Sequence, residues 1–234
     1  MIPSSFARPR PSAALALALL LGLGGCSRGR DAAIPDASAG AERQANVATD
    51  PPRIVFLGTS LTAGYGLPDP ALAYPALIQQ RLDAAQLRYR VVNAGVSGAT
   101  SADSRRSIDW IMTDPASVLV IETGANDGLR GLDVDSMRAN IQAIIDRARR
   151  QEPPPRIILV GMEAPPNYGA SYTRRFREVF PELARANGVA FIPFLLTGVA
   201  GIDSLNQGDG IHPTPTGQRI IAANVWRVLE PLLR

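Results

Sequence analysis

Lysine is absent from this chain of 234 residues, and histidine and cysteine occur once each, so all 24 basic residues are arginine. Without lysine, the chain has no Schiff-base lysine, no pyridoxal phosphate anchor, no Ser-Lys dyad and no P-loop lysine. One histidine and one cysteine likewise exclude a zinc site built from these two residue types. Any chemistry must therefore come from hydroxyls, carboxylates, amides and the single imidazole, His212.

The first residues carry the pattern of an export signal. Arg8 and Arg10 precede the apolar run AALALALLLGLGG, which continues up to Cys26. This run is shorter than the roughly 20 apolar residues that a membrane-spanning helix needs, and small residues precede the cysteine. Residues 1–25 are therefore predicted to be a cleaved leader.

The end of the leader reads LGGC, Leu23 to Cys26, and resembles the lipobox of bacterial lipoproteins, in which the cysteine is lipidated and becomes the first mature residue. A lone cysteine has no partner for an internal disulfide, which fits this interpretation. Residues 26–52 are poor in large apolar side chains and are predicted to be a flexible tether. The resemblance implies a lipoprotein on the periplasmic side of a bacterial membrane, and Ser27 after the cysteine favours the outer membrane. An ordinary signal peptide is the alternative.

The sequence pI of about 9.5 does not indicate a nucleic-acid partner. Loss of residues 1–25 removes two arginines and no acidic residue, so the formal net charge falls from +3 to +1. The chain also has no basic run with interleaved aromatic residues. We therefore expect no binding to nucleic acid.

From Arg53 onward, short apolar runs alternate with segments of helical period. Nearly continuous apolar runs are typical of strands covered on both faces, and here they occupy residues 53–58, 89–95, 117–124, 156–162 and 189–194. The alternation predicts a flavodoxin-like, three-layer α/β/α domain over residues 53–234, with a five-stranded parallel sheet.

Two helices carry clear sequence signals. Thr100 and Asp103 have the spacing of a capping box, which predicts a helix start at this point. Further along, one helical stripe gathers the apolar residues Val134, Met137, Ile141, Ile144, Ile145 and Ala148. The segment from Pro215 repeats this pattern with Ile221, Val225, Val228 and Leu229.

Chemically useful residues follow the strands, at the edge where the functional loops of a parallel sheet lie. Ser60 follows the first strand, Gly98 the second and Asn126 the third, and the loop after the fifth strand carries Asp209 and His212. A hydroxyl nucleophile, an imidazole base, a carboxylate and amide donors are the groups that acyl transfer requires.

Ester hydrolysis gives each of these residues a role. Ser60 is the candidate nucleophile, and His212 is the candidate base because the ordinary pKa of histidine, about 6.5, suits proton transfer near neutrality. Asp209 can hold the Nδ1 proton of that imidazole. The backbone amides of Ser60 and Gly98 and the side chain of Asn126 are the candidate oxyanion hole.

These residues also carry a family resemblance. GTSL at residues 58–61, Gly98, GAND at 124–127 and DGIHP at 209–213 resemble, in order and spacing, the four blocks of the SGNH hydrolases, often called GDSL esterases. Within them the chain is similar to the bacterial periplasmic arylesterase, acyl-CoA thioesterase and lysophospholipase group. The resemblance implies the SGNH hydrolase fold and a serine hydrolase that needs no metal or cofactor. The implied substrates are arylesters, short to medium acyl esters, acyl thioesters or lysophospholipids.

One position departs from the family pattern, and two other functions stay open. Thr59 stands where the family usually has an aspartate, so the turn around Ser60 is expected to differ in shape. The alternatives are an acetylesterase acting on carbohydrate or cell wall, and a non-catalytic surface-binding lipoprotein. Three further carboxylates, Asp103, Asp127 and Asp203, are interpreted as cap, turn and loop residues.

Overall fold

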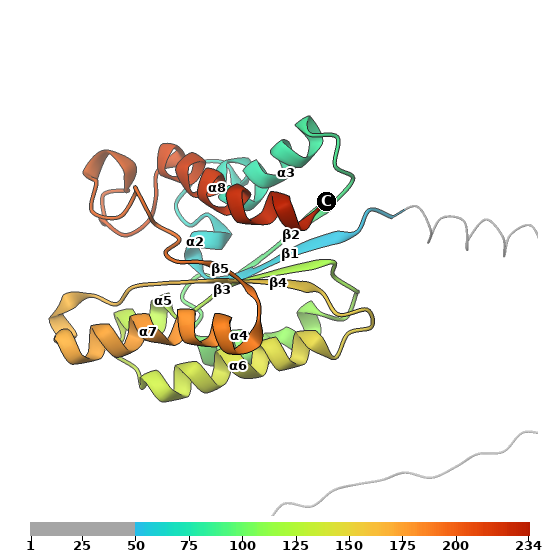
Figure 1. Ribbon diagram of the computed structural model, residues 1–234. Helices are drawn as coiled ribbons and strands as arrows, with labels where there is room; N and C mark the ends of the chain where they lie inside the picture. Colours follow the sequence, from blue (N-terminus) through green and yellow to red (C-terminus); the bar gives the residue numbers. More distant parts are fainter. Residues whose placement is uncertain (1–49) are drawn as a thin grey trace, which may run out of the picture. The chain divides into compact units, whose positions relative to one another are not determined.

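A computed structural model of the protein describes residues 50–234, so the predicted leader, Cys26 and most of the predicted tether lie outside the described residues. The described chain forms three layers, with a parallel sheet between two layers of helices (Figure 1). The strands run in the order β2-β1-β3-β4-β5, which is the order of flavodoxin-like folds and confirms the predicted architecture. They are β1 (Arg53–Gly58), β2 (Arg90–Gly95), β3 (Val118–Glu122), β4 (Arg156–Val160) and β5 (Ala190–Ile192).

Helices cover both faces of the sheet, as right-handed crossovers between parallel strands require (Figure 1). One face is covered by α2 (Ser60–Ala63), α3 (Tyr74–Ala84) and α8 (Pro215–Leu229). The opposite face is covered by α4 (Ser101–Ile111), α5 (Ala125–Leu129), α6 (Val134–Arg149) and α7 (Ala170–Asn187). Short 3₁₀ turns are η1 (Pro70–Leu72), η2 (Pro166–Tyr168), η3 (Asp203–Leu205) and η4 (Glu230–Leu232).

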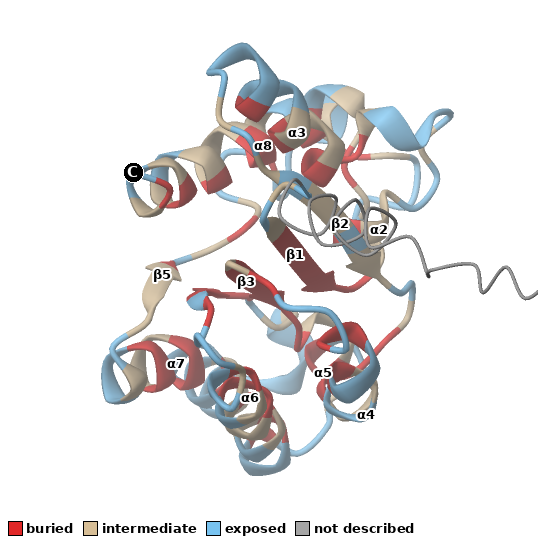
Figure 2. Ribbon diagram, turned by 90° about the vertical axis from the view of Figure 1, so that its right-hand side faces the viewer, coloured by how far each residue is buried: buried red, intermediate tan, exposed pale blue. Residues whose placement is uncertain are grey.

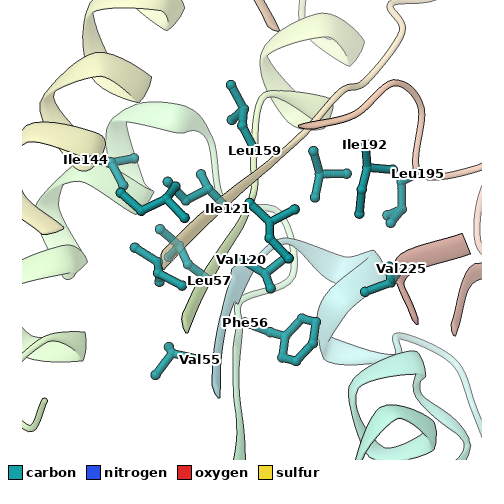
Figure 3. Close-up of a cluster of buried hydrophobic side chains, with 14 of the residues drawn as sticks. Val55, Phe56, Leu57, Val120, Ile121, Ile144, Leu159, Ile192, Leu195 and Val225 are labelled. Atoms are coloured by element: carbon teal, nitrogen blue, oxygen red, sulfur yellow. The ribbon is translucent and has the colours of Figure 1, made fainter. Parts of the chain in front are cut away.

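The core lies on both sides of the two central strands. Successive side chains of a strand point to opposite faces, so β1 sends Phe56 toward Val225 of α8 and Leu57 toward the side of Ile144 of α6 (Figure 3). From Ile54 to Leu57, β1 is buried, and so is the whole of β3. These strands therefore form a rigid support for the loops that follow them.

The local predictions for the helices are confirmed. All six apolar residues of the predicted stripe in α6 are buried. Thr100 caps α4 in a capping box, accepting from the amide of Asp103 while the Asp103 carboxylate accepts from the amide of Thr100. In α8, Val228 is only half-buried, whereas the other three predicted residues are buried.

The expectation that every strand is covered on both faces is wrong for β2. None of its residues is fully buried, because β2 lies at the edge of the sheet and pairs only with β1 (Figure 2). The third strand is also shorter than predicted: β3 ends at Glu122, and Gly124 takes a left-handed conformation (φ 97°) at the start of α5. Within the described residues, no helix has the length and apolar character needed to cross a membrane.

Candidate active site

Ser60 is the first residue of α2, a single helical turn that directly follows β1. Thr59 is the N-cap, and Gly64 ends the turn in a left-handed conformation (φ 77°). Its position at the carboxyl end of a central strand leaves the Ser60 side chain facing the loops at this edge of the sheet. The predicted nucleophile is therefore carried by a short, tightly wound segment on a buried strand.

His212 and Asp209 meet Ser60 in a chain of hydrogen bonds. The His212 Nε2 atom lies 2.9 Å from Ser60 Oγ, and its Nδ1 atom lies 2.6 Å from Asp209 Oδ2. The other carboxylate oxygen of Asp209 accepts from the backbone amides of Ile211 (2.9 Å) and His212 (3.0 Å). Because the His212 amide, the His212 ring and the Ile211 amide all donate to it, the pKa of Asp209 is held well below its ordinary value. An ionised Asp209 fixes the proton on Nδ1 and leaves Nε2 free to accept the Ser60 proton.

The loop that carries both residues is closed on itself. The Gln207 amide donates to the His212 carbonyl (2.7 Å), and the Thr214 amide donates to the Leu205 carbonyl (2.8 Å). Asn206 and Pro213 form an antiparallel bridge between the two sides of the loop. We call residues 205–214 the base loop, since it presents the imidazole.

Tyr65 and Gln207 hold the base loop against the segment that follows α2. The Gln207 side-chain amide donates to the Tyr65 carbonyl (2.8 Å) and to the Pro213 carbonyl (3.1 Å). The Tyr65 ring packs on the His212 ring, with centroids 4.6 Å apart. The imidazole is thus held at its carboxylate side and on its face. Neither Tyr65 nor Gln207 was singled out from the sequence.

The predicted oxyanion donors come from three loops at the same edge. Gly98 takes a left-handed conformation (φ 79°), and the Arg130 guanidinium donates to its carbonyl (2.9 Å). The Asn126 side-chain amide donates to the Ala99 carbonyl (3.0 Å), which joins the loops after β2 and β3 and leaves its second N–H group unused. Within residues 50–234, the backbone amides of Ser60 and Gly98 donate to no acceptor. Three N–H donors thus remain available in this region.

Of the three carboxylates interpreted as structural residues, Asp103 and Asp127 accept hydrogen bonds in the described structure. Asp103 caps α4, and Asp203 begins the short turn η3. Asp127 is buried, which is unusual for a turn residue. Its carboxylate accepts from both the amide (2.8 Å) and the hydroxyl (2.6 Å) of Ser101. It therefore fixes α5 to the start of α4.

A cavity of about 390 Å³ opens beside Ser60 and His212. Such a volume is within the range of small-molecule sites. Its wall is mainly apolar and includes Leu61, Leu129, Met162, Phe194, Leu196 and Ile211. A larger depression of about 690 Å³ lies near Pro51 and Arg90, and it contains none of the candidate residues. Across the described part of the chain, no three His, Cys, Asp or Glu side chains gather where they could hold a metal ion.

Sequence reasoning missed Glu122, a fully buried carboxylate at the end of β3. It accepts hydrogen bonds from Thr59 and Thr62 on either side of the nucleophile. Burial raises the pKa of Glu122 to about 7, although these hydrogen bonds oppose the rise. A single acidic residue inside the apolar run VLVIE was the available signal, because carboxylates are rarely buried without a specific partner.

Comparison with known proteins shows which family the sequence matches. A model of the GDSL-like lipase/acylhydrolase family matches residues 56–220. Esterase TesA of Pseudomonas aeruginosa is 38% identical over 181 residues, which cover 77% of this chain and 89% of that protein. Thioesterase 1/protease 1/lysophospholipase L1 of Escherichia coli is 34% identical over 182 residues, which cover 77% of this chain and 84% of that protein.

A solved structure gives the same result for the fold. The psychrotrophic esterase EstA from Pseudoalteromonas sp., in a structure inhibited by monoethylphosphonate, superimposes with a TM-score of 0.72 at 30% identity. The match covers 77% of this chain and 98% of that protein. The likeness inferred from the four sequence blocks is confirmed, and the chain belongs to the GDSL-like lipase/acylhydrolase family.

Proposed function

We propose that this protein hydrolyses carboxylic esters and thioesters, with Ser60 as nucleophile, His212 as general base and Asp209 as the residue that orients it. The observation that carries the proposal is the continuous hydrogen-bonded chain from Asp209 through His212 to Ser60, at the wall of an apolar cavity. A serine hydroxyl is inert until a base removes its proton, and this arrangement supplies the base in the required tautomer.

In the first half of the reaction, Ser60 Oγ attacks the carbonyl carbon while its proton passes to His212 Nε2. The imidazolium that forms is stabilised by the ionised Asp209 at Nδ1. Collapse of the tetrahedral intermediate breaks the bond to the alcohol or thiol, which leaves with the proton from Nε2. The acyl group remains esterified to Ser60.

In the second half, water replaces the alcohol. His212 Nε2 takes a proton from this water as its oxygen attacks the acyl carbon. Collapse of the second intermediate returns that proton to Ser60 Oγ and releases the carboxylic acid. A single base serves both halves, which fits a chain with only one histidine.

Each tetrahedral intermediate carries a negative oxygen that needs fixed donors. We assign this role to the backbone amides of Ser60 and Gly98 and to the second N–H of the Asn126 side chain. The hydrogen bond from Asn126 to Ala99 and that from Arg130 to Gly98 hold two of these donors before substrate arrives. Donors held in advance stabilise developing charge without reorganisation during the reaction.

The cavity favours substrates with an apolar acyl chain. Its lining offers aliphatic and aromatic surface beside Ser60, which suits burial of several methylene groups. An acetyl group would leave most of this surface without contact. The names of the relatives, which include esterase, thioesterase and lysophospholipase, support the same substrate range.

The proposal includes a lipid anchor at Cys26. The support is the sequence LGGC at the end of an apolar leader, followed by a segment poor in large apolar residues before β1. Such an anchor would hold the domain on the periplasmic side of a bacterial membrane, and Ser27 favours the outer membrane. Amphiphilic esters, which gather at membrane surfaces, would then be concentrated near the cavity.

A panel of chromogenic esters tests the proposed activity. The 4-nitrophenyl esters of acetate, butyrate and octanoate are compared with acetylated xylan, using Ser60→Ala protein as the blank. We expect kcat/KM to rise from acetate to the longer chains. Preference for acetylated xylan would instead support a carbohydrate acetylesterase. No activity from folded protein on any substrate would support the binding lipoprotein.

A further inference from the structure

The carboxylate of Glu122 contacts both sides of the nucleophile turn. The backbone amide of Thr59 donates to its Oε2 atom (2.7 Å), and the Thr59 hydroxyl lies 2.9 Å from Oε1 and 3.0 Å from Oε2. The Thr62 hydroxyl donates to Oε2 (2.8 Å). Ser60 lies between these two threonines, so one carboxylate holds the residue before the nucleophile and the residue two positions after it.

The close packing around this carboxylate depends on Gly58. A Cβ atom at Gly58 would lie 1.9 Å from the Thr62 hydroxyl oxygen and 2.7 Å from Glu122 Oε2. Any larger residue would therefore push the carboxylate and the turn apart. The network continues to α3, because the Tyr74 hydroxyl lies 2.7 Å from the Thr62 hydroxyl. With Thr62 donating to Glu122, Tyr74 becomes the donor to Thr62.

Glu122 also joins the two loops on which the reaction depends. It is the last residue of β3, four positions before Asn126, whereas Thr59 directly precedes Ser60. The hydrogen bonds therefore connect the nucleophile turn to the strand that leads into the oxyanion loop. A change in these bonds would alter the position of Ser60 relative to Asn126.

We propose that Glu122 is a positioning residue, which in its ionised form holds the Ser60 turn and the Asn126 loop in the relative placement that acyl transfer requires. The inference rests on the proposed ester hydrolysis and names a group beyond the triad and the oxyanion donors. Thr59 is its first partner, and its hydroxyl gives the carboxylate a neutral donor at the position where the family usually has an acid.

Protonation of Glu122 weakens its hydrogen bonds to Thr59 and Thr62, which together we call the clamp. A neutral carboxyl turns one acceptor oxygen into a donor, so a threonine hydroxyl that donated to it must turn and accept instead. The hydrogen bond from the Thr59 amide also loses its charged acceptor. The groups that face Glu122 in the described structure are these two threonines from the nucleophile turn, the Tyr74 hydroxyl from α3 and the Gly58 backbone from β1. None is a cation, so burial dominates and the pKa of Glu122 lies at about 7.

The dependence of kcat on pH is therefore expected to differ between the parent and a variant whose residue 122 cannot titrate. Activity requires His212 as a free base, and it is about 10- to 100-fold higher when Glu122 is ionised than when it is neutral. The acid limb of log kcat against pH is expected to be steeper in the parent than in a variant whose residue 122 cannot titrate. A residue with a purely structural role would not change this slope.

The first test replaces Glu122 by glutamine. Glu122→Gln keeps the size of the side chain but removes the charge and replaces one acceptor oxygen by an amide N–H group, so we expect kcat to fall about 10- to 100-fold with KM within about twofold. Glu182→Gln, the same chemical change on α7 where Glu182 pairs with Arg138, is the matched control. Folded Glu122→Gln with kcat and acid slope equal to those of Glu182→Gln would overturn the proposal.

A second pair of variants decides the matter if Glu122→Gln does not fold. Thr59→Val removes only the hydroxyl that donates to Glu122, and Thr59→Ser restores it. We expect a loss of about tenfold in kcat for valine and near-parent activity for serine. Thr59→Asp places a second carboxylate beside Glu122 and should move the acid limb to higher pH by about one unit. Equal kcat for the valine and serine variants contradicts the clamp, as does an unshifted acid limb in Thr59→Asp.

Labelling of Ser60 by a fluorophosphonate separates this inference from the ester-hydrolase proposal. The rate of labelling, followed by mass spectrometry, reports the reactivity of Ser60 without any assumption about the substrate. Slower labelling in Glu122→Gln than in Glu182→Gln supports the clamp even if every ester in the panel fails. An active parent whose Glu122→Gln and Glu182→Gln variants label equally fast retains the proposed function and loses the clamp.

Discussion

His212 Nε2 lies 2.9 Å from Ser60 Oγ although the two residues are 152 positions apart in the chain. The contact exists because Ser60 follows the first strand of the sheet and His212 follows the last, and all five strands end at the same edge. The fold therefore brings the proposed nucleophile and base together without any local sequence signal.

Replacing Ser60 by alanine should abolish esterase activity and leave the fold intact. Loss of the nucleophile from a coupled triad can lower kcat by about a million-fold. Hydrolysis of 4-nitrophenyl butyrate and the thermal unfolding curve are measured on the same preparation. The parent should also take up one organophosphate on Ser60. A label on another serine, or a variant that retains more than a few per cent of activity, would remove Ser60 from this role.

Replacing Asp209 by asparagine should lower kcat by about 10⁴-fold while KM changes little. An amide N–H at this position favours the tautomer with its proton on Nε2, which cannot accept the Ser60 proton. The base loop itself should stay closed, because the amide oxygen can still accept from Ile211 and His212. Steady-state kinetics measure the effect. A loss below about tenfold would mean that Asp209 does not orient the base.

Asn126→Ala should lower kcat by about 10²–10³-fold, the usual loss for one oxyanion donor. Substrate affinity should change little, because the donor acts most strongly once negative charge has formed. Asn126→Asp should be at least as damaging, since an ionised carboxylate donates nothing and repels the intermediate. The split between kcat and KM is the measurement. Weaker binding with unaltered kcat would make Asn126 a substrate-positioning residue instead.

The buried Glu122 should make the folded protein less stable as the pH rises from about 4.5 to about 7. Its pKa is raised from 4.5 to about 7 by burial, so over this range the unfolded chain loses the proton while the folded chain keeps it. The free energy of unfolding at the upper end of the range is then about 3 kcal/mol lower than at the lower end. The free energy of urea unfolding, measured at several pH values, should show this fall in the parent.

Glu122→Gln should remove this fall, and parallel curves for parent and variant would contradict it. Three aspartates change stability with pH in the opposite direction: Asp103, Asp133 and Asp209. Hydrogen bonds depress their pKa values, so the stability that they contribute is lost as the pH falls. Measurements kept above about pH 4.5 lie above the range in which these three carboxylates titrate.

Cys26→Ala should block lipid modification and release the protein from membranes. A chain that starts near Arg53 should keep full activity on soluble esters, because the site lies wholly within residues 53–234. Fractionation of cells that express each form is the measurement. Ser27→Asp serves as the control, since it should keep the anchor and favour the inner membrane. Equal membrane association of the parent and Cys26→Ala would contradict the lipobox.

The structural elements that local sequence determines were predicted well. The stripe of α6 and the cap of α4 depend on residues three and four positions apart, and both are present. Residues that follow a strand in a parallel sheet gather at one edge, so the meeting of Ser60 with His212 followed from the order of the strands. The exposure of β2 did not follow, because whether a strand lies at the edge is decided by the topology.

The contacts that sequence reasoning missed join residues far apart in the chain. Glu122 lies 63 positions from Thr59, and Gln207 lies 142 positions from Tyr65, so no local pattern links either pair. Thr59 was noted as a departure from the family pattern, but its effect depends on a carboxylate that only the folded chain places beside it. An isolated glutamate in a buried strand was the one visible sign of that partner.

The base loop keeps the proposed base and the carboxylate that orients it in one closed segment of the chain. Its two sides are joined by the Gln207–His212 and Leu205–Thr214 backbone hydrogen bonds, and it contains both the imidazole and the carboxylate that orients it. Changes in sequence outside residues 205–214 can therefore alter the surroundings of the cavity without separating the carboxylate from the base. Exchange of residues 205–214 between related hydrolases would therefore move this pair as one piece, if the residues that the loop contacts at positions 65, 199 and 202 are matched.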